Sequence, residues 1–184
     1  ICNAISKLSQ TLHTPTPEQA KHLYHLLRYL HSTADKTLQI KPTQDTGMII
    51  YSDSNFADPS DKRRRSTSGT YVTLHGRPIA WRSKRQSCTA DSTHEAELYA
   101  LHQSLKVGLG LKFTLTELGL IKRDCTNTIF VDNEATTHTS VLRDQISNKN
   151  RHIDTRYFKI CDHVESKEFT VTWVSGKHNP ADIF

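Results

Sequence analysis

The sequence lacks several features that define well-known protein classes. Its 184 residues contain only four cysteines, and these are scattered without the spacing of a zinc site or of a secreted disulfide scaffold. No apolar run approaches the roughly 20 residues that a membrane-spanning helix needs. The first residues show neither an initiator methionine nor a signal-peptide pattern. We therefore expect reduced thiols, an intracellular protein and a chain cut from a longer one.

Acidic residues are missing from one long stretch. Between Lys62 and Ala90 there are eight Lys or Arg and no Asp or Glu, whereas the formal net charge of the whole chain is only +5. A solvated basic face explains such a stretch as well as a surface for a polyanion does.

The N-terminal part has the pattern of two amphipathic helices. Apolar residues at helical spacing predict one helix within Ile1–Leu12, and a second helix follows Thr16 as cap and Pro17 as first helical residue. Helices of this length bury their own apolar stripes poorly, so we expect them to pack on a missing part of a longer chain or on the following domain. Residues 32–47 are interpreted as a linker with a short strand at 37–40.

From Met48 onward the pattern predicts a mixed sheet with helices on its faces, in the order β-β-β-α-β-α-α-β-α. A capping sequence beginning at Ser92 starts the longest helix, which Gly119 ends. Trp81 and Trp173 fall on strands, and core packing is expected for both. The predicted strands are 48–53, 68–76, 77–84, 128–132 and 168–175, and the predicted helices are 92–118, 133–142, one around 153–164 and a last one from 180.

Four acidic residues occupy related places in this layout. Asp53 and Asp132 stand at the ends of the first and fourth strands, Glu97 lies in the first turns of the long helix, and Asp182 follows Asn179-Pro180. If the two strands are neighbours, their carboxylates lie side by side and repel, which implies cations such as Mg²⁺ or Mn²⁺. Each residue alone is better explained as a turn, cap or solvated residue. The four together are much harder to explain in that way.

Five segments resemble, in the right order, the ribonuclease H region of copia-type retrotransposons. An upstream segment, ISKLSQTLHTPTPEQAKHLYHLLRYLHST, resembles the end of the same family's reverse transcriptase. The resemblance implies a reverse transcriptase tail at residues 1–40 and a ribonuclease H domain at 47–184, with a truncated last helix and an α/β, ribonuclease H-like fold. The five segments are YSDSNFADPSDKRRRSTSGTYVTLHGRPIAWRSKRQ, STHEAELYAL, IFVDNEA, RHIDTRYFKI and HNPADIF.

The same resemblance implies a metal site and an activity. Asp53, Glu97, Asp132 and Asp182 match the family's four metal-binding carboxylates, with Asp53 bridging two Mg²⁺ ions that Mn²⁺ is able to replace. Glu97 is preferred to Glu95 because it precedes the family pattern at Leu98–Leu101, and Glu95 suits the capping box. Asp182 is preferred to Asp154, which is interpreted as a structural ion-pair residue.

The expected function is an endonuclease that hydrolyses the RNA strand of RNA–DNA hybrids during retrotransposon reverse transcription. Two metal ions about 4 Å apart would activate a water and stabilise the leaving oxygen. His178 matches a mobile histidine of cellular ribonucleases H that assists proton transfer or product release, the alternative being a solvated loop residue. Expected partners are the hybrid and the remainder of the Pol polyprotein, with no membrane, in a cytoplasmic virus-like particle or in the nucleus.

Phosphate contacts are expected from the basic residues and from the start of the long helix. Three rival hypotheses remain. The first is an inactive or domesticated nucleic-acid-binding module. The second is a DNA-cutting integrase or transposase, whose Glu comes from a helix after the fifth strand. The third is a structural helical fragment, which leaves the carboxylates unexplained.

The residues expected to contact phosphates are Lys62, Arg63, Arg64, Arg65, Arg82, Lys84, Arg85, Ser92, Thr93 and His94.

Overall fold

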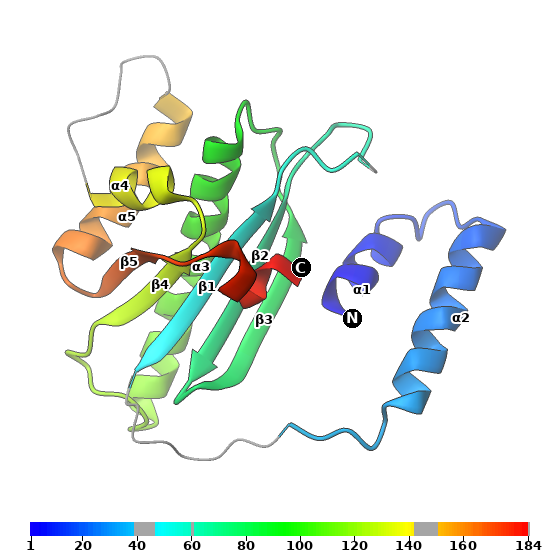
Figure 1. Cartoon of the computed structure of the whole chain (residues 1–184), viewed down its shortest axis with the longest axis horizontal. Coiled ribbons are helices and arrows are strands. Elements are labelled where there is room, and N and C mark those ends of the chain that lie inside the picture. Colours follow the sequence, from blue (N-terminus) through cyan, green and yellow to red (C-terminus); the bar gives the residue numbers. More distant parts are fainter. Residues whose placement is uncertain (39–46, 60, 142–150, 184) are drawn as a thin grey trace.

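The computed structural model describes residues 1–38, 47–59, 61–141 and 151–183, without the side chains of residues 141 and 151–154. It contains a five-stranded sheet in the order β3-β2-β1-β4-β5 (Figure 1). The β1–β2 and β2–β3 pairs are antiparallel, whereas β1–β4 and β4–β5 are parallel, which confirms the predicted mixed sheet. The strands are β1 (Met48–Asn55), β2 (Thr67–Leu74), β3 (Arg77–Arg85), β4 (Asn127–Val131) and β5 (Phe169–Trp173).

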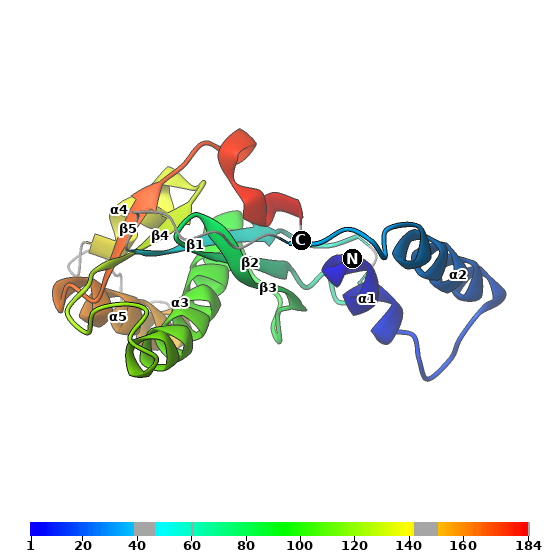
Figure 2. The same cartoon turned by 90° about the horizontal axis from the view of Figure 1, so that it is seen from below.

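Helices and short 3₁₀ turns lie on opposite faces of this sheet. The long helix α3 (Thr93–Glu117) packs across β1 and β2 and beside α5 (Arg151–Glu165), with α4 (Glu134–Val141) next to α5. Figure 2 shows α3 and α5 on one side of the sheet and the C-terminal 3₁₀ turns, η2 (Gly176–His178) and η3 (Pro180–Ile183), on the other. The last helix expected from residue 180 is thus a single 3₁₀ turn. In the ranges described, no helix is both long enough and apolar enough to cross a membrane.

The helix α3 forms where the capping sequence predicts it. The Ser92 Oγ accepts a hydrogen bond of 3.1 Å from the Glu95 backbone N–H, and Gly119, with φ 68°, adopts the left-handed conformation that ends a helix. The buried side of α3 forms one continuous core with the sheet and α5. The largest members of this core include Met48, Ile50, Val72, Leu101, Leu105, Ile129, Ile160 and Phe169.

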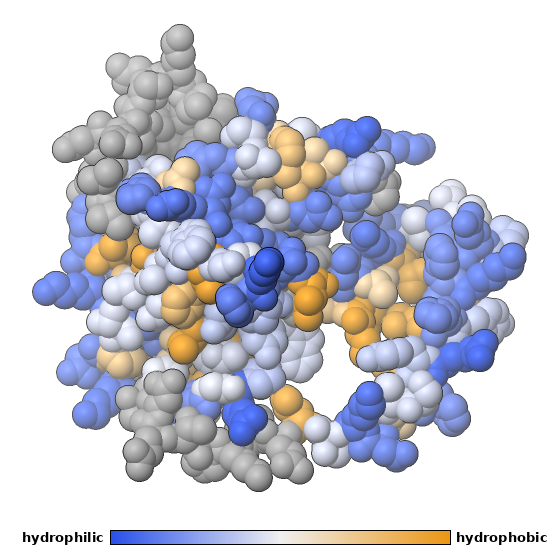
Figure 3. Space-filling view, in the orientation of Figure 1, coloured by the Kyte–Doolittle hydropathy of each residue, from blue (hydrophilic) through white to orange (hydrophobic). Residues whose placement is uncertain are grey.

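The two N-terminal helices are α1 (Cys2–Ser9) and α2 (Pro17–Ser32), and neither contains a buried residue. Thr16 caps α2 in a capping box with Gln19, which confirms the helix start predicted at Thr16 and Pro17. One helix, α1, lies against β3, whereas apolar residues of α2 such as Leu23 and Leu27 remain exposed. Figure 3 shows orange hydrophobic patches on the inner side of the α1–α2 region, at the right of the view, with mostly blue residues along its outer side. The expected strand at 37–40 is not formed at residues 37 and 38, and residues 39 and 40 lie outside the described residues.

The expectation of buried tryptophans is wrong. Trp81 is 53% exposed and Trp173 is 50% exposed, because both lie on the edge strands β3 and β5. The register pairs Trp81 with Tyr71 and Tyr71 with Tyr51, so these rings alternate with the residues that face α3. An aromatic side chain on a strand therefore does not reveal whether a helix covers its face.

The close approach of α3 to the sheet depends on Gly108. A Cβ atom at this position would overlap the Ile50 Cδ1 atom and lie 3.2 Å from the Phe169 Cε1 atom, whereas one at Gly110 would meet nothing within 4 Å. We expect Gly108→Ala to destabilise the fold by about 1–3 kcal/mol through overpacking. The matched variant Gly110→Ala should be stabilising by up to about 1 kcal/mol, because alanine favours helix. Chemical denaturation measures both variants, and equal effects would contradict this packing.

Candidate metal centre

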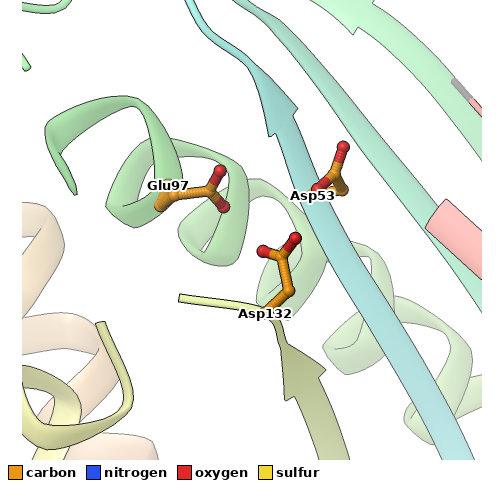
Figure 4. Close-up of side chains that lie close together, drawn as sticks. All are labelled: Asp53, Glu97 and Asp132. Atoms are coloured by element: carbon orange, nitrogen blue, oxygen red, sulfur yellow. The ribbon is translucent and has the colours of Figure 1, made fainter. Parts of the chain in front are cut away.

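Three carboxylates come together at the carboxyl ends of the parallel strands β1 and β4. Ser52 pairs with Val131, so the next residues in each chain segment, Asp53 and Asp132, lie side by side. Glu97, from the second turn of α3, points toward them (Figure 4). One oxygen from each of the three residues lies within 4.8 Å of the other two.

The electrostatics of this cluster favour a bound cation. Burial, followed by the charges of Asp53 and Asp132, raises the pKa of Glu97 to about 8. Burial, followed by the charges of Asp132 and Asp182, raises the pKa of Asp53 to about 7. The pKa of Asp132 is also raised, first by burial. Among the residues that the structure describes, none gives the buried Glu97 Oε2 atom a hydrogen bond, so an oxygen ligand is available inside a site where negative charges repel.

Asp182 lies at the edge of the same site. It lines an open cavity of about 420 Å³ with the other three carboxylates, and its charge raises the pKa of both Asp53 and Asp132. Its side chain is exposed, and it is not part of the group whose oxygens lie within 4.8 Å of one another. The described structure thus gathers three of the four predicted carboxylates closely and places the fourth beside them.

Asn179 attaches the segment that carries Asp182 to the sheet. Its buried amide donates a hydrogen bond of 3.1 Å to the Ser52 backbone carbonyl, and its Oδ1 accepts one of 3.1 Å from the Ala181 backbone N–H. Asn179 was interpreted from the sequence only as a helix cap. Its hydrogen bond to Ser52 joins the segment that carries Asp182 to the residue before Asp53. This contact holds Asp182 beside Asp53.

Glu95 and Glu97 have separate surroundings. The Glu95 carboxylate accepts a hydrogen bond of 2.6 Å from the Asp91 backbone N–H. This bond directs the carboxylate back toward the loop before α3, and Glu95 is not part of the group formed by Asp53, Glu97 and Asp132. The side chain of Asp154, the alternative to Asp182, lies outside the described residues, as does that of His152.

Two of the predicted site residues are histidines. His178 is exposed on η2 and is not among the residues that line the carboxylate cavity in the described structure. The ring nitrogens of His94 lie 3.3 Å from the Thr136 hydroxyl and 3.5 Å from the Thr139 hydroxyl, which engages the ring with α4. Ser92 serves as the α3 cap and Thr93 is the first residue of that helix, and both are exposed. Phosphate contacts by these residues stay a prediction.

The basic residues fall into two groups. Asp61 accepts hydrogen bonds of 2.8 Å from Arg65 and 2.7 Å from Arg85, and the Arg65 hydrogen bond is the main cause of an Asp61 pKa well below the usual range. These two arginines thus hold the β1–β2 loop to β3, and Asp61 offsets part of their charge. The other basic candidates are on that loop and on β3, namely the exposed Lys62, Arg63 and Arg64 and the groove-lining Arg82 and Lys84.

Several residues near the cluster had no signal in the sequence. Asn3 of α1, Asn55 and Phe56 line the carboxylate cavity, and no motif or spacing marks them. The exposed indole of Trp173 donates a hydrogen bond of 3.1 Å to the Asp132 backbone carbonyl, which supports the turn that presents this carboxylate.

Comparison with known proteins gives relatives along the whole chain. It is 32% identical over 183 residues to the retrovirus-related Pol polyprotein from transposon TNT 1-94 of Nicotiana tabacum, which covers 100% of this chain. It is 26% identical over 183 residues to the transposon Ty1-JR2 Gag-Pol polyprotein of Saccharomyces cerevisiae, which covers 97% of this chain. The chain spans only 13% and 10% of the lengths of these polyproteins. No family model matches the chain.

Solved structures show the same fold at low sequence identity. LC11-RNase H1, isolated from compost, superposes with a TM-score of 0.53 at 18% identity, over 75% of this chain and 91% of that protein. The same enzyme in complex with an RNA/DNA hybrid gives a TM-score of 0.51 at 16% identity, over 74% and 91% of the two chains. The fold, together with an alignment that covers nearly all of this chain, shows that the chain belongs to the ribonuclease H-like domains of copia- and Ty1-type Pol polyproteins.

Proposed function

We propose that the chain is an endonuclease that hydrolyses the RNA strand of RNA–DNA hybrids during retrotransposon reverse transcription. The observation that carries this proposal is the meeting of Asp53, Glu97 and Asp132, from three different elements, within 4.8 Å in a largely buried site. A group of carboxylates so placed has little structural use, because each charge raises the cost of the others. Such a group suits the binding of metal ions, whose concentrated positive charge a reaction at phosphorus needs.

The residues present fit divalent metal ions. Asp53, Glu97 and Asp132 would hold them, with Asp182 completing the set from the edge of the cavity. Hard oxygen ligands favour Mg²⁺, and Mn²⁺ accepts the same ligands. When bound, such ions activate a water and stabilise the leaving oxygen of an in-line displacement.

The protein's own residues would hold the substrate and move a proton. Lys62, Arg63 and Arg64 extend from the loop that follows β1, at the same end of the sheet as Asp53, and suit contacts to backbone phosphates. His178 lies four residues before Asp182 on an exposed turn, where it could carry a proton to or from solvent. Selectivity for the hybrid would come from groove shape and 2′-hydroxyl contacts. That LC11-RNase H1 has been solved with an RNA/DNA hybrid supports the choice of substrate.

The remainder of the Pol polyprotein is the proposed partner. Residues 1–40 would be the tail of a reverse transcriptase, and the exposed apolar residues of α2 suit packing against the rest of that enzyme. The relatives extend far beyond the part that this chain matches. A cytoplasmic particle of the retrotransposon is the proposed location, with the nucleus as the alternative.

One observation favours a second candidate function, a nucleic-acid-binding module without cleavage. Asp182 is exposed and stands outside the tight group of three carboxylates. If the fourth ligand is needed for turnover, the chain would bind hybrids and leave them intact.

An end-labelled RNA–DNA hybrid tests the proposal directly, beside single-stranded RNA and duplex DNA in Mg²⁺. We expect cleavage of the hybrid's RNA strand alone. Asp132→Asn should lower the rate by more than about 100-fold, since loss of even an outer-shell partner of a metal ligand costs about 10–100-fold. Asp35→Asn, which removes an exposed carboxylate of the N-terminal part, is the matched control and should leave the rate unchanged. His178→Ala should slow cleavage without abolishing it. Binding without cleavage in both Mg²⁺ and Mn²⁺ would favour the second candidate.

The raised pKa values also predict how stability depends on pH in the absence of metal. The folded chain holds protons on Asp53 and Glu97 up to about pH 7 and pH 8, whereas the unfolded chain releases them near pH 4. The folded state therefore binds more protons in this window, and the free energy of unfolding falls as the pH rises through it.

Thermal melts in EDTA between about pH 6.5 and pH 8 measure this effect, since below this range the lowered pKa values of His94 and His102 make stability change in the opposite direction. We expect Glu97→Gln to flatten the fall of the melting temperature and Mg²⁺ to restore stability at the alkaline end, whereas Asp35→Asn should change neither. A melting temperature that rises with pH in EDTA would contradict the electrostatics of the cluster.

A further inference from the structure

One buried glutamine joins the sheet to the first turns of α3. Gln86 follows β3 directly, and its backbone N–H donates a hydrogen bond of 2.8 Å to the Ser66 carbonyl. This bond continues the β2–β3 pairing, in which Thr67 lies opposite Arg85. Only 1% of Gln86 is exposed, so its side chain lies inside the protein at a position that the sheet fixes.

The Gln86 amide forms a bridge between β2 and α3. Its Nε2 atom donates one hydrogen bond of 3.0 Å to the Ser68 hydroxyl and another of 3.0 Å to the Ala96 backbone carbonyl. A carbonyl only accepts hydrogen bonds, so the nitrogen of the amide, and not its oxygen, must face Ala96. Both amide hydrogens are thus used, and the surroundings fix the orientation of the side chain.

Each end of this bridge adjoins a carboxylate of the cluster. Ala96 is the residue before Glu97. Ser68 pairs across the sheet with Ser54, which follows Asp53. Because the carboxylates of Asp53 and Glu97 repel each other when charged, the start of α3 is driven away from the end of β1. The bridge opposes that movement, since it ties together the neighbours of the two repelling groups.

The bridge leaves one polar atom of the glutamine without a partner. Among the described residues, none donates a hydrogen bond to the buried Gln86 Oε1 atom. A buried polar atom without a partner costs about 1–3 kcal/mol of stability. An apolar side chain of the same length would avoid this cost. The stability of the fold alone therefore does not account for glutamine at this position.

A second buried hydrogen bond attaches α3 to the same strand, further along the helix. The hydroxyls of Thr70 and Ser104 lie 2.8 Å apart, and both residues are buried. Ser104 lies about two helical turns, or about 10 Å along the axis, beyond Glu97. The two contacts both join β2 to α3, and they differ in their distance from the carboxylates. This pair therefore provides a matched comparison for the Gln86 bridge.

We propose that Gln86 is a positioning residue, which holds Glu97 beside Asp53 in the arrangement that a divalent metal ion requires. The proposal rests on the proposed function, because it takes the carboxylates as a metal site. Gln86 acts through the backbone of α3, since its amide holds the Ala96 carbonyl and the next residue carries the ligand. Loss of a hydrogen-bond partner behind a metal ligand typically costs about 10–100-fold in metal affinity.

Binding of Mn²⁺ alone to the full chain tests this role, with the EPR signal of the free ion as the measurement. Gln86→Met replaces the amide by an apolar chain of the same length, and we expect it to weaken Mn²⁺ binding by about 10-fold. Thr70→Val is the matched control, because it removes the other hydrogen bond between β2 and α3 and should leave the Mn²⁺ affinity unchanged. Chemical denaturation in EDTA shows whether the two variants lose comparable stability.

Cleavage of the hybrid gives a second readout on the same proteins. The Mg²⁺ concentration that gives half of the maximal rate should rise in Gln86→Met by a factor similar to its loss of Mn²⁺ affinity, while the KM for the hybrid stays unchanged. Ser68→Ala removes only one end of the bridge and should weaken Mn²⁺ binding by less. This smaller change tests the proposal if Gln86→Met does not fold.

The outcomes separate the two proposals. Cleavage by the parent chain, with Mn²⁺ binding by folded Gln86→Met equal to that of the parent, would overturn the positioning role and leave the nuclease intact. Equal losses of Mn²⁺ affinity in Gln86→Met and Thr70→Val would do the same, as would parental affinity in Ser68→Ala if Gln86→Met is unfolded. Weaker Mn²⁺ binding in Gln86→Met but not in Thr70→Val, without cleavage by the parent chain, would support the positioning role and contradict the nuclease. Absence of Mn²⁺ binding by the parent chain would overturn both.

Discussion

Mutual repulsion of three carboxylates is the constraint around which the rest of this structure is arranged. Parallel pairing of β1 with β4 brings Asp53 and Asp132 together, and the close packing of α3 on the sheet adds Glu97. Their pKa values are raised by burial and by one another, so the assembled site is least favourable when it is fully charged. Surrounding contacts must therefore hold the chain against this repulsion, and a bound cation would remove it.

Those holding contacts are distant from one another in sequence. Gly108 allows α3 to sit close to Ile50 and Phe169, and the Asn179 amide ties the C-terminal turn to the Ser52 carbonyl. Asp61 forms ion pairs with Arg65 and Arg85 and so fixes the β1–β2 loop beside β3. The exposed cations Lys62, Arg63 and Arg64 remain at the tip of that loop.

Much of this arrangement could be predicted from local sequence pattern. Alternating apolar residues predicted the strands, Ser92 predicted the start of α3, and the position of Asp53 and Asp132 at the ends of two strands predicted that they would meet if those strands were neighbours. The pattern does not show which strands form the sheet edges, so Trp81 and Trp173 were wrongly expected in the core. Nor does it show that Arg85 pairs with Asp61, because that contact joins residues 24 positions apart in the chain. The assignment of residues 1–40 to a reverse transcriptase stays a prediction.

The most direct test of this account is a crystal structure of the chain grown with Mn²⁺, with anomalous scattering used to locate the ions. We predict ions bound between Asp53, Glu97 and Asp132, with Asp182 contributing from the cavity edge, and carboxylate positions close to those described. Diffraction that showed no ion among these residues, or carboxylates turned apart with Glu97 directed to solvent, would contradict the central claim that the cluster is a metal site.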